Sequence, residues 1–306
     1  MMIKYWKIWI INLILISNTN ACDICGISSG FNSLGQINTL SRQYLLLESQ
    51  HNNFIHPATN PSKNSLDQIS TQQLHYAWKS DSMPRLQWIA NLSYKTVVRD
   101  NVYLNNPNFQ TQGLGDLNLR GIYTLYDNRN YNLDNPIKKL IMLQGGMRLP
   151  TGKYQLRGAE KEMLPMHLQP GNGSWQGEMA INSFLRYRNL GIQLGSIINV
   201  STTNELNYKI GTRNSNSIAV FYNHSNSTQT LIPQVFAQYD WIDQDQQYKQ
   251  KINTTGAQWM KLGLQIDWIF RKLYVRGRWE NPISSNLSTA APQPTSTTTL
   301  SIGILL

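Results

Sequence analysis

The sequence predicts an all-β protein, a single antiparallel transmembrane β-barrel of about 12 strands of the outer-membrane type. Three observations predict it: long segments of alternating apolar and polar side chains, connections that alternate between long and short, and few charges. Only 14% of the 306 residues are charged. Asn, Gln, Ser and Thr replace the missing charges. Because a barrel turns apolar side chains to lipid and neutral polar ones to its lumen, this composition disfavours a soluble enzyme.

The first 21 residues predict a signal peptide. Lys4 and Lys7 precede an apolar run over 8–16, and Ala21 closes a site that suits signal peptidase. The apolar run is too short to span a bilayer as a helix. We therefore expect residues 22–40 to form a periplasmic N-terminal segment and residues 41–306 to form a barrel in the outer membrane of a Gram-negative cell. Outer-membrane lipid and the barrel assembly machinery are then its expected partners.

Cys22 and Cys25 are the two cysteines of the chain, and both follow the predicted cleavage point. A lone CxxC pair has three interpretations, which the sequence leaves open: a local disulfide, half of a metal site, or lipidation of Cys22. Apart from a metal at this pair, the sequence indicates no cofactor.

The clearest alternation covers 85–99. Leu86, Trp88 and Leu92 share one face, Gln87 and Asn91 the other, and Ile89 is the main exception. A strand of this length crosses a membrane at a tilt. The pattern predicts the following strands: 41–54, 70–79, 84–99, 114–128, 137–149, 175–188, 191–203, 212–224, 230–242, 255–270, 272–283 and 294–306.

The connections between these strands alternate in length. Short turns are expected near 80–83, 189–190, 225–229 and 271–272. The mostly long connections are those around 55–69, 100–113, 150–174, 204–211, 243–254 and 284–293. Tight periplasmic turns with long outer loops are typical of outer-membrane barrels, and an even strand count puts both termini in the periplasm. The alternative is a secreted β-sandwich or solenoid, which also alternates; the strands of a sandwich are usually nearer five or six residues.

The alternation also assigns charged side chains to the lumen. About nine basic groups against about five acidic ones would bias a water-filled pore toward anions, unless the charges pair across strands and plug a narrow barrel. The expected luminal residues are Lys95, Arg99, Asp116, Arg120, Arg148, Glu178, Arg186, Lys261, Arg276 and Arg278, with Arg188, Asp240, Asp267 and Glu280 beside them.

The loop over 150–174 is the most promising functional element. Pro and Gly at both of its ends fix tight bends, so we expect a defined shape that folds over or into the pore. Its notable residues are Pro150, Thr151, Gly152, Lys153, Gln169, Pro170, Gly171 and Gly173, followed by Trp175. No strand-to-helix pattern follows Gly152-Lys153, which argues against nucleotide binding.

Four motifs occur in order: CDICG at 22–26, GLGDLNLRGIY at 113–123, GGMRLPTGKY at 145–154 and LQPGNGSW at 168–175. In this order the chain resembles the outer-membrane transporter-like family grouped with the meta-pathway of phenol degradation, in its Bacteroidetes-type branch with the CDICG N-terminus. The resemblance implies a channel for small, aromatic or hydrophobic molecules. Relatives often have a third cysteine at the position of Ile27, so we do not expect a site that needs three thiols in this chain.

Catalytic patterns are weak. A Ser–His hydrolase on a strand needs the two residues two positions apart, whereas Ser225 directly follows His224 and Ser227 lies three positions on. His51, His56, His75 and His167 lack metal-ligand spacing and are interpreted as loop or interface residues. The net charge of +10 comes without a clustered basic run, which disfavours nucleic acid.

The sequence therefore predicts a non-enzymatic outer-membrane channel for passive passage of a small-molecule solute. A surface binding or adhesion barrel and an outer-membrane hydrolase are the alternatives. A plugged barrel with large ordered loops would favour binding, and a His–Ser cluster at the rim would favour hydrolysis.

Overall fold

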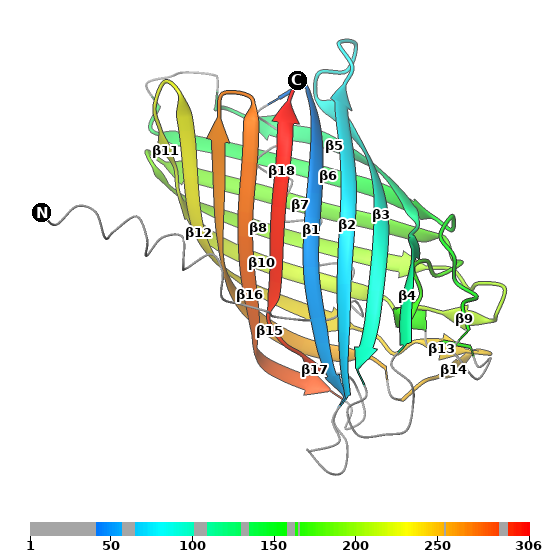
Figure 1. Ribbon diagram of the computed structural model, residues 1–306. Helices are drawn as coiled ribbons and strands as arrows, with labels where there is room; N and C mark the ends of the chain where they lie inside the picture. The colour runs from blue at the N-terminus through cyan, green and yellow to red at the C-terminus, as the bar shows by residue number, and fades with distance from the viewer. Residues whose placement is uncertain are drawn as a thin grey trace, which may run out of the picture.

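The structure, a computed structural model, describes residues 41–56, 65–100, 109–129, 135–157, 163–164, 166–253, 255–287 and 293–306. Twelve long antiparallel strands form a closed barrel in this part of the chain (Figure 1). They are β1 (Gln43–His56), β2 (Ser65–Lys79), β3 (Leu86–Asp100), β5 (Leu117–Asp127), β6 (Ile137–Leu149), β7 (Gln176–Tyr187), β8 (Leu190–Ser201), β10 (Arg213–Tyr222), β12 (Gln229–Ile242), β15 (Ala257–Phe270), β16 (Leu273–Leu287) and β18 (Thr297–Leu305).

The short strands either extend the barrel sheet or form a small separate sheet. β4 (Phe109–Leu114) continues the line of β5 along β3, β17 (Gln293–Pro294) pairs with β1, and β11 (His224–Ser225) pairs with β12. β9 (Tyr208–Lys209), β13 (Gln246–Gln247) and β14 (Gln250–Lys251) form a separate small sheet. A single turn of 3₁₀ helix, η2, covers Met166–Leu168.

The barrel closes where its first and last strands meet. β1 pairs with β18 from Tyr44↔Leu305 to His51↔Thr298, and the ring continues through β16 and β15 to β12, which pairs with β10. A closed sheet satisfies its backbone hydrogen bonds internally, which is the condition for crossing lipid with strands. No helix among the described residues has the length and apolar character needed to span a bilayer.

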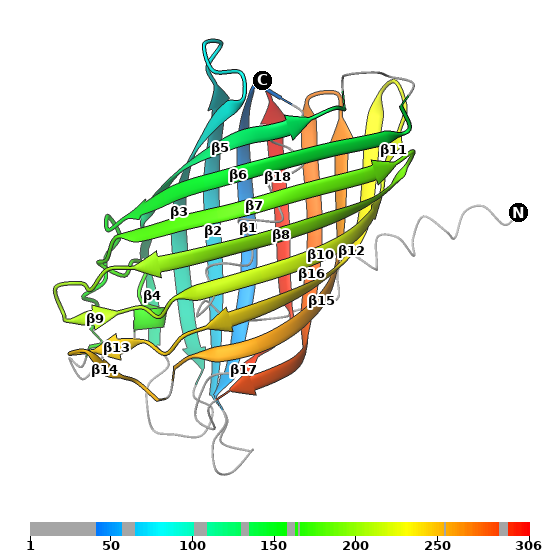
Figure 2. The same cartoon turned by 180° about the vertical axis from the view of Figure 1, so that it is seen from behind.

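The predicted architecture is confirmed, and each predicted strand corresponds to an observed one within a few residues. The strand over 137–149 matches β6 without change. Short turns and the C-terminus share one end of the barrel, and the small sheet of β9, β13 and β14 lies at the other (Figure 2). The predicted signal peptide and the segment 22–40 with Cys22 and Cys25 lie outside the described residues, so these assignments stay predictions.

The outward side chains form an apolar band around the barrel. Leu264, Ile266 and Ile304 are each more than half exposed on an isolated chain. Tyr239 and Trp241 lie toward the long-loop end of β12, and Tyr94 lies just past the middle of β3 toward the same end; these outward aromatic residues resemble an interfacial girdle. Such a band is stable only against lipid, because a soluble protein does not expose apolar surface of this extent.

The inward side chains form three layers. An apolar layer with Leu46, Ile89, Phe184 and Tyr274 lies beside the short turns, and polar residues follow. Smaller apolar clusters around Phe54 and Trp259 lie toward the long loops. The inward residues of β1 show the sequence of layers: Tyr44, Leu46, Glu48, Gln50, Asn52 and Phe54. Ile89 is therefore no irregularity, since it belongs to the inner apolar layer.

The apolar band leads to a test of the membrane assignment. Replacing Leu264, outward near the middle of β15, by Arg is expected to cost about 2–4 kcal/mol of folding free energy in lipid, because Arg at the bilayer midplane loses its hydration. Denaturant titration in phospholipid vesicles measures the change. Tyr248→Arg, in the exposed turn between β13 and β14, is the control and should change stability little; equal costs for both variants would contradict the assignment.

Candidate functional site

The polar layer inside the barrel is held together by buried charges. The Asp267 carboxylate accepts hydrogen bonds from Arg276 Nε at 2.6 Å and Gln265 Nε2 at 2.9 Å. The hydroxyl of Tyr274 donates to the same carboxylate. Arg276 and Asp267 are almost completely buried, so each charge is stabilised by the other and not by hydration.

A second group of buried charges lies further toward the long loops. Arg278 Nη2 donates to Glu280 at 2.6 Å, and Lys261 Nζ lies 3.1 Å from Glu280 and 3.3 Å from Asp240. The indole of Trp259 donates to Asp240 at 2.7 Å. Most of these expected luminal charges therefore compensate one another across neighbouring strands, and they fill this part of the lumen.

The lumen holds two acidic residues that the sequence pattern did not indicate. Glu48 is fully buried and accepts from Ser301 Oγ at 3.0 Å, and Asp67 is fully buried against Arg99, 2.5 Å away. Both lie on β1 and β2, whose alternation is weak in sequence, so their inward position was not evident. With these acids included, the excess of positive charge in the lumen is smaller than the sequence suggested.

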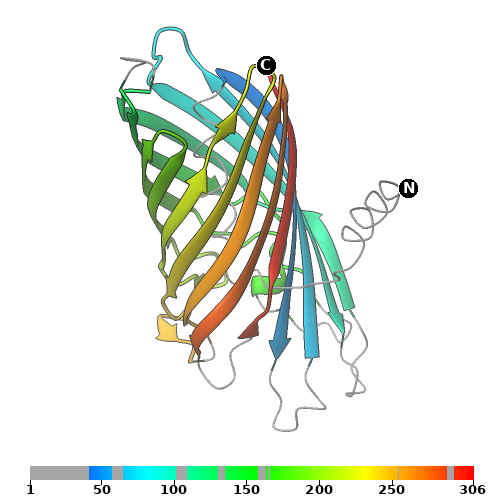
Figure 3. The ribbon, with the colours of Figure 1, turned by 90° about the vertical axis from the view of Figure 1, so that its left-hand side faces the viewer.

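The described part of the loop over 150–174 (150–157, 163–164 and 166–174) reaches the inner wall of the barrel, and Figure 3 draws its short helix η2 in green among the strands. Leu168 is completely buried and packs with Phe54, Ile69 and Val97 from the first three strands. Lys95 Nζ donates to the carbonyl of Gln169 at 2.9 Å, which joins β3 to the same segment. The loop therefore narrows the lumen from inside.

Two glycines and one carboxylate fix the ends of this loop. A Cβ on Gly171 would lie 2.6 Å from the carbonyl carbon of Gly152, so the two backbones cross in contact. The Asp116 carboxylate accepts from the backbone N–H of Gly152 at 2.9 Å and of Asn172 at 3.2 Å. Thr151 Oγ1 accepts from the N–H of Leu117 at 2.9 Å. The turn residues singled out in the sequence thus hold a defined loop shape.

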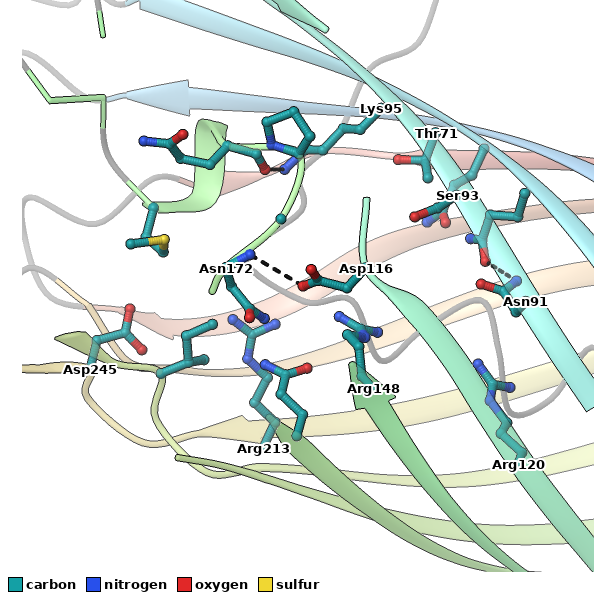
Figure 4. A pocket seen from close by; sticks show the side chains of 18 of the residues that line it. Thr71, Asn91, Ser93, Lys95, Asp116, Arg120, Arg148, Asn172, Arg213 and Asp245 are labelled. Carbon is teal, nitrogen blue, oxygen red and sulfur yellow. Dashed lines mark hydrogen bonds between the residues drawn. The ribbon is translucent and has the colours of Figure 1, made fainter. Parts of the chain in front are cut away.

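A cavity of about 130 Å³ lies beside this loop, in the outer half of the lumen (Figure 4). Lys95, Arg120, Arg148 and Arg213 contribute positive charge to its wall, against Asp116 and Asp245. The remaining lining is mostly neutral and polar. The cavity is therefore positively charged on balance.

The acidic groups of the cavity wall are already engaged. Asp116 holds the loop, and Asp245 accepts from the backbone N–H of Gly211 at 2.7 Å and from the hydroxyl of Tyr208. Burial and the neighbouring carboxylate raise the pKa of Tyr208, so this hydroxyl keeps its proton and the outer loops stay joined. Among the basic groups of the wall, Arg120 lies 3.4 Å from Glu178, which offsets its positive charge.

Hydrogen-bond donors without acceptors lie next to Arg148. Among the described residues, Arg213 Nε and Asn199 Nδ2 are buried and have no hydrogen-bond partner. Arg213 pairs with Asn199 across β10 and β8, and both line a second small pocket together with Arg148 and Gln176. Buried donors usually have acceptors, so this group is suited to an anion.

The residues predicted from sequence separate into distinct groups. Lys95, Asp116, Arg120, Glu178, Lys261, Arg276 and Arg278 are buried inside the barrel, and Arg99, Arg148 and Arg186 are partly buried. Arg188 instead lies exposed in the turn between β7 and β8 with a φ of 51°. In the loop, Gly152, Gln169 and Gly171 are buried, Pro150, Pro170 and Gly173 are partly buried, and Thr151, Lys153 and Trp175 are exposed.

The sequence missed Arg213 because its strand alternates weakly, and it missed Asn199 because only charged side chains were considered as luminal candidates. No group of three or more His, Cys, Asp or Glu residues within the described ranges has the arrangement of a metal site. His224 and Ser225 lie exposed in β11, and Ser225 bonds Asn223 and Thr230.

Comparison with known proteins supports the fold. No protein-family model matches the sequence, and no curated protein matches it. The structure is similar to an outer membrane channel from Pseudomonas putida F1, with a TM-score of 0.65 at 12% identity over 87% of this chain and 96% of that chain. The β domain of the Bordetella autotransporter BrkA is less similar, with a TM-score of 0.49 at 11% identity over 87% of this chain and 99% of that chain.

At this level of identity the likeness establishes the barrel fold. It agrees with the fold that the family resemblance implied. Membership of the narrower branch with the CDICG motif stays a prediction, since residues 1–40 lie outside the described part of the chain.

The glycine crossing gives a test of the loop's position. Gly171→Val would force the loop away from Gly152, so we expect trypsin to cleave faster after Lys153, which is exposed at the loop's start. Gly145→Val is the matched control, because a Cβ at this outward position meets no atom within 4 Å. Unchanged cleavage in Gly171→Val would show that the crossing does not hold the loop.

Proposed function

We propose that this protein is an outer-membrane channel that passes small organic anions without an enzymatic step. The observation that carries the proposal is the wall formed by Arg148 and Arg213, which line both the cavity and the second small pocket. There Arg213 Nε and Asn199 Nδ2 are buried donors that lack acceptors. The apolar outer band supports residence in a membrane, and the inward loop supports selection of solutes at the mouth.

A carboxylate is the solute group best suited to this wall. A guanidinium presents parallel N–H groups that match the two oxygens of a carboxylate, and Asn199 Nδ2 adds a neutral donor. Met166, Pro170 and Ile210 contribute apolar surface to the cavity, and Ile210 also lines the second pocket together with Asn199. An aromatic acid would use both kinds of surface, which reconciles the cationic wall with the aromatic solutes that the family resemblance implies.

The route through the barrel is closed beside the short turns. The inner apolar layer contains side chains from nearly every long strand, and Phe184 packs edge-on against Phe221 at a centroid distance of 6.5 Å. Water and ions cross such an apolar constriction poorly. In this proposal the apolar layer is the gate, and solutes pass when its side chains move aside.

The gate has a direct test. Phe184→Ala removes an aromatic ring from the layer, so we expect single-channel conductance in planar bilayers to rise about twofold or more. Leu185→Ala, on the outer face of the same strand, is the matched control and should leave conductance unchanged. Equal conductance of both variants and the unmodified protein would remove the gate from the proposal.

The anion site is tested on the Phe184→Ala background, where current is easier to measure. Under a potassium chloride gradient we expect chloride to permeate better than potassium, and the preference to fall toward one in Arg148→Gln and Arg213→Gln. Arg271→Gln, in the exposed turn between β15 and β16, is the control and should keep the preference. Equal permeability of both ions before mutation would overturn the anion proposal.

The filled lumen favours a second candidate, a barrel that binds partners or solutes at the cell surface through ordered outer loops. The small sheet of β9, β13 and β14 and the contact between Tyr154 and Glu205 at 2.7 Å give these loops structure. A protein that binds carboxylates but conducts no ions, even as Phe184→Ala, would support this candidate over the channel.

A further inference from the structure

A serine and a histidine lie in contact on the outer wall of the barrel. Ser49 Oγ is 3.2 Å from His51 Nε2, and the other ring nitrogen, Nδ1, is 2.9 Å from Ser70 Oγ on the neighbouring strand. Gln72 Nε2 donates to Ser49 Oγ at 2.9 Å. Since Ser49 accepts from Gln72, its own hydroxyl hydrogen is available to the imidazole.

These contacts assign a consistent pattern of hydrogen bonds. With the proton on Nδ1, His51 donates to Ser70 and its Nε2 accepts from Ser49. This is the order of a nucleophile, a general base and a group that orients the base. The spacing of two positions places Ser49 and His51 on the same face of β1.

The group faces the surroundings of the barrel and not its lumen. Along β1, Leu45 and Leu47 point outward in line with Ser49 and His51, whereas Glu48 and Gln50 are buried inside. β1 and β2 lie side by side on the wall shown in Figure 1. Access therefore comes from the lipid side, independently of the channel.

The group lies where the outward face of β1 and β2 changes from apolar to polar. Toward the long loops, the outward side chains of β1 change from Leu47 to Ser49 and His51, and those of β2 change from Leu74 to Gln72. The apolar band of a barrel ends where lipid acyl chains meet their headgroups. This is the depth at which membrane lipids carry their ester bonds.

We propose that Ser49 and His51 form a second, catalytic site that hydrolyses acyl esters of lipids at the outer interface of the membrane. The proposal goes beyond channel function and does not depend on it.

The reaction needs only the ester and water. Ser49 Oγ attacks the ester carbonyl carbon while His51 Nε2 takes the hydroxyl proton, and the imidazolium then gives this proton to the departing alcohol oxygen. The acyl group remains on Ser49 as an ester. Water, deprotonated by His51, attacks that ester, which releases the fatty acid and restores Ser49. Ser70 touches no reacting atom and acts as a positioning residue for the imidazole.

The test uses the full-length protein refolded in detergent micelles. A fluorophosphonate probe reports the nucleophile, and release of p-nitrophenol from a long-chain acyl ester reports turnover. We expect the probe to be found on Ser49 by mass spectrometry, and turnover to fall about 100-fold or more in Ser49→Ala and His51→Ala. Ser225→Ala, an exposed serine in β11, should keep both signals.

The positioning role of Ser70 has its own readout. Ser70→Ala should lower turnover and move the pH profile, while Ser70→Thr, which keeps the hydroxyl, should restore both. Each variant is first checked for the compact barrel by its shifted mobility in unheated gels, so that unfolding is separated from loss of chemistry. No label on Ser49 in the folded protein, or equal turnover in Ser49→Ala, would overturn the proposal while leaving the channel proposal intact.

Discussion

The structure depends on the requirement that a sheet in lipid leave no backbone polar group unpaired. Antiparallel pairing continues around the barrel and ends in the ladder between β1 and β18. Because side chains alternate along a strand, the register of this ladder also decides which residues face inward. The pairing Tyr44↔Leu305 thus sets both the closure and the content of the lumen.

Because the sheet is closed, side chains fill most of the interior of the barrel. Near the short turns they are apolar and pack as in a soluble core, and in the middle they are charged and must compensate one another. Near the long loops, around Arg148 and Arg213, a cavity opens and buried donors lack acceptors. The candidate solute site is therefore the part of the lumen where a cavity lies beside buried hydrogen-bond donors.

The sequence could predict the barrel, its strands and the inward position of residues such as Lys261 and Arg276. These follow from the alternation of apolar and polar side chains along each strand. It could not predict which charges pair, since the contact between Arg99 and Asp67 depends on the register of β2 and β3. It also missed the contact of His51 with Ser49 and Ser70. Ser49 lies two positions before His51, where the strand pattern is weak, and Ser70 belongs to another strand.

The seam between β1 and β18 has a consequence for how the protein is made. The residues that it joins, such as Tyr44 and Leu305, stand near opposite ends of the chain. The ring cannot be completed until the last strand has been synthesised and exported, and so high a contact order slows spontaneous folding. Until then two long strand edges have unpaired backbone groups, and such edges favour aggregation with other chains.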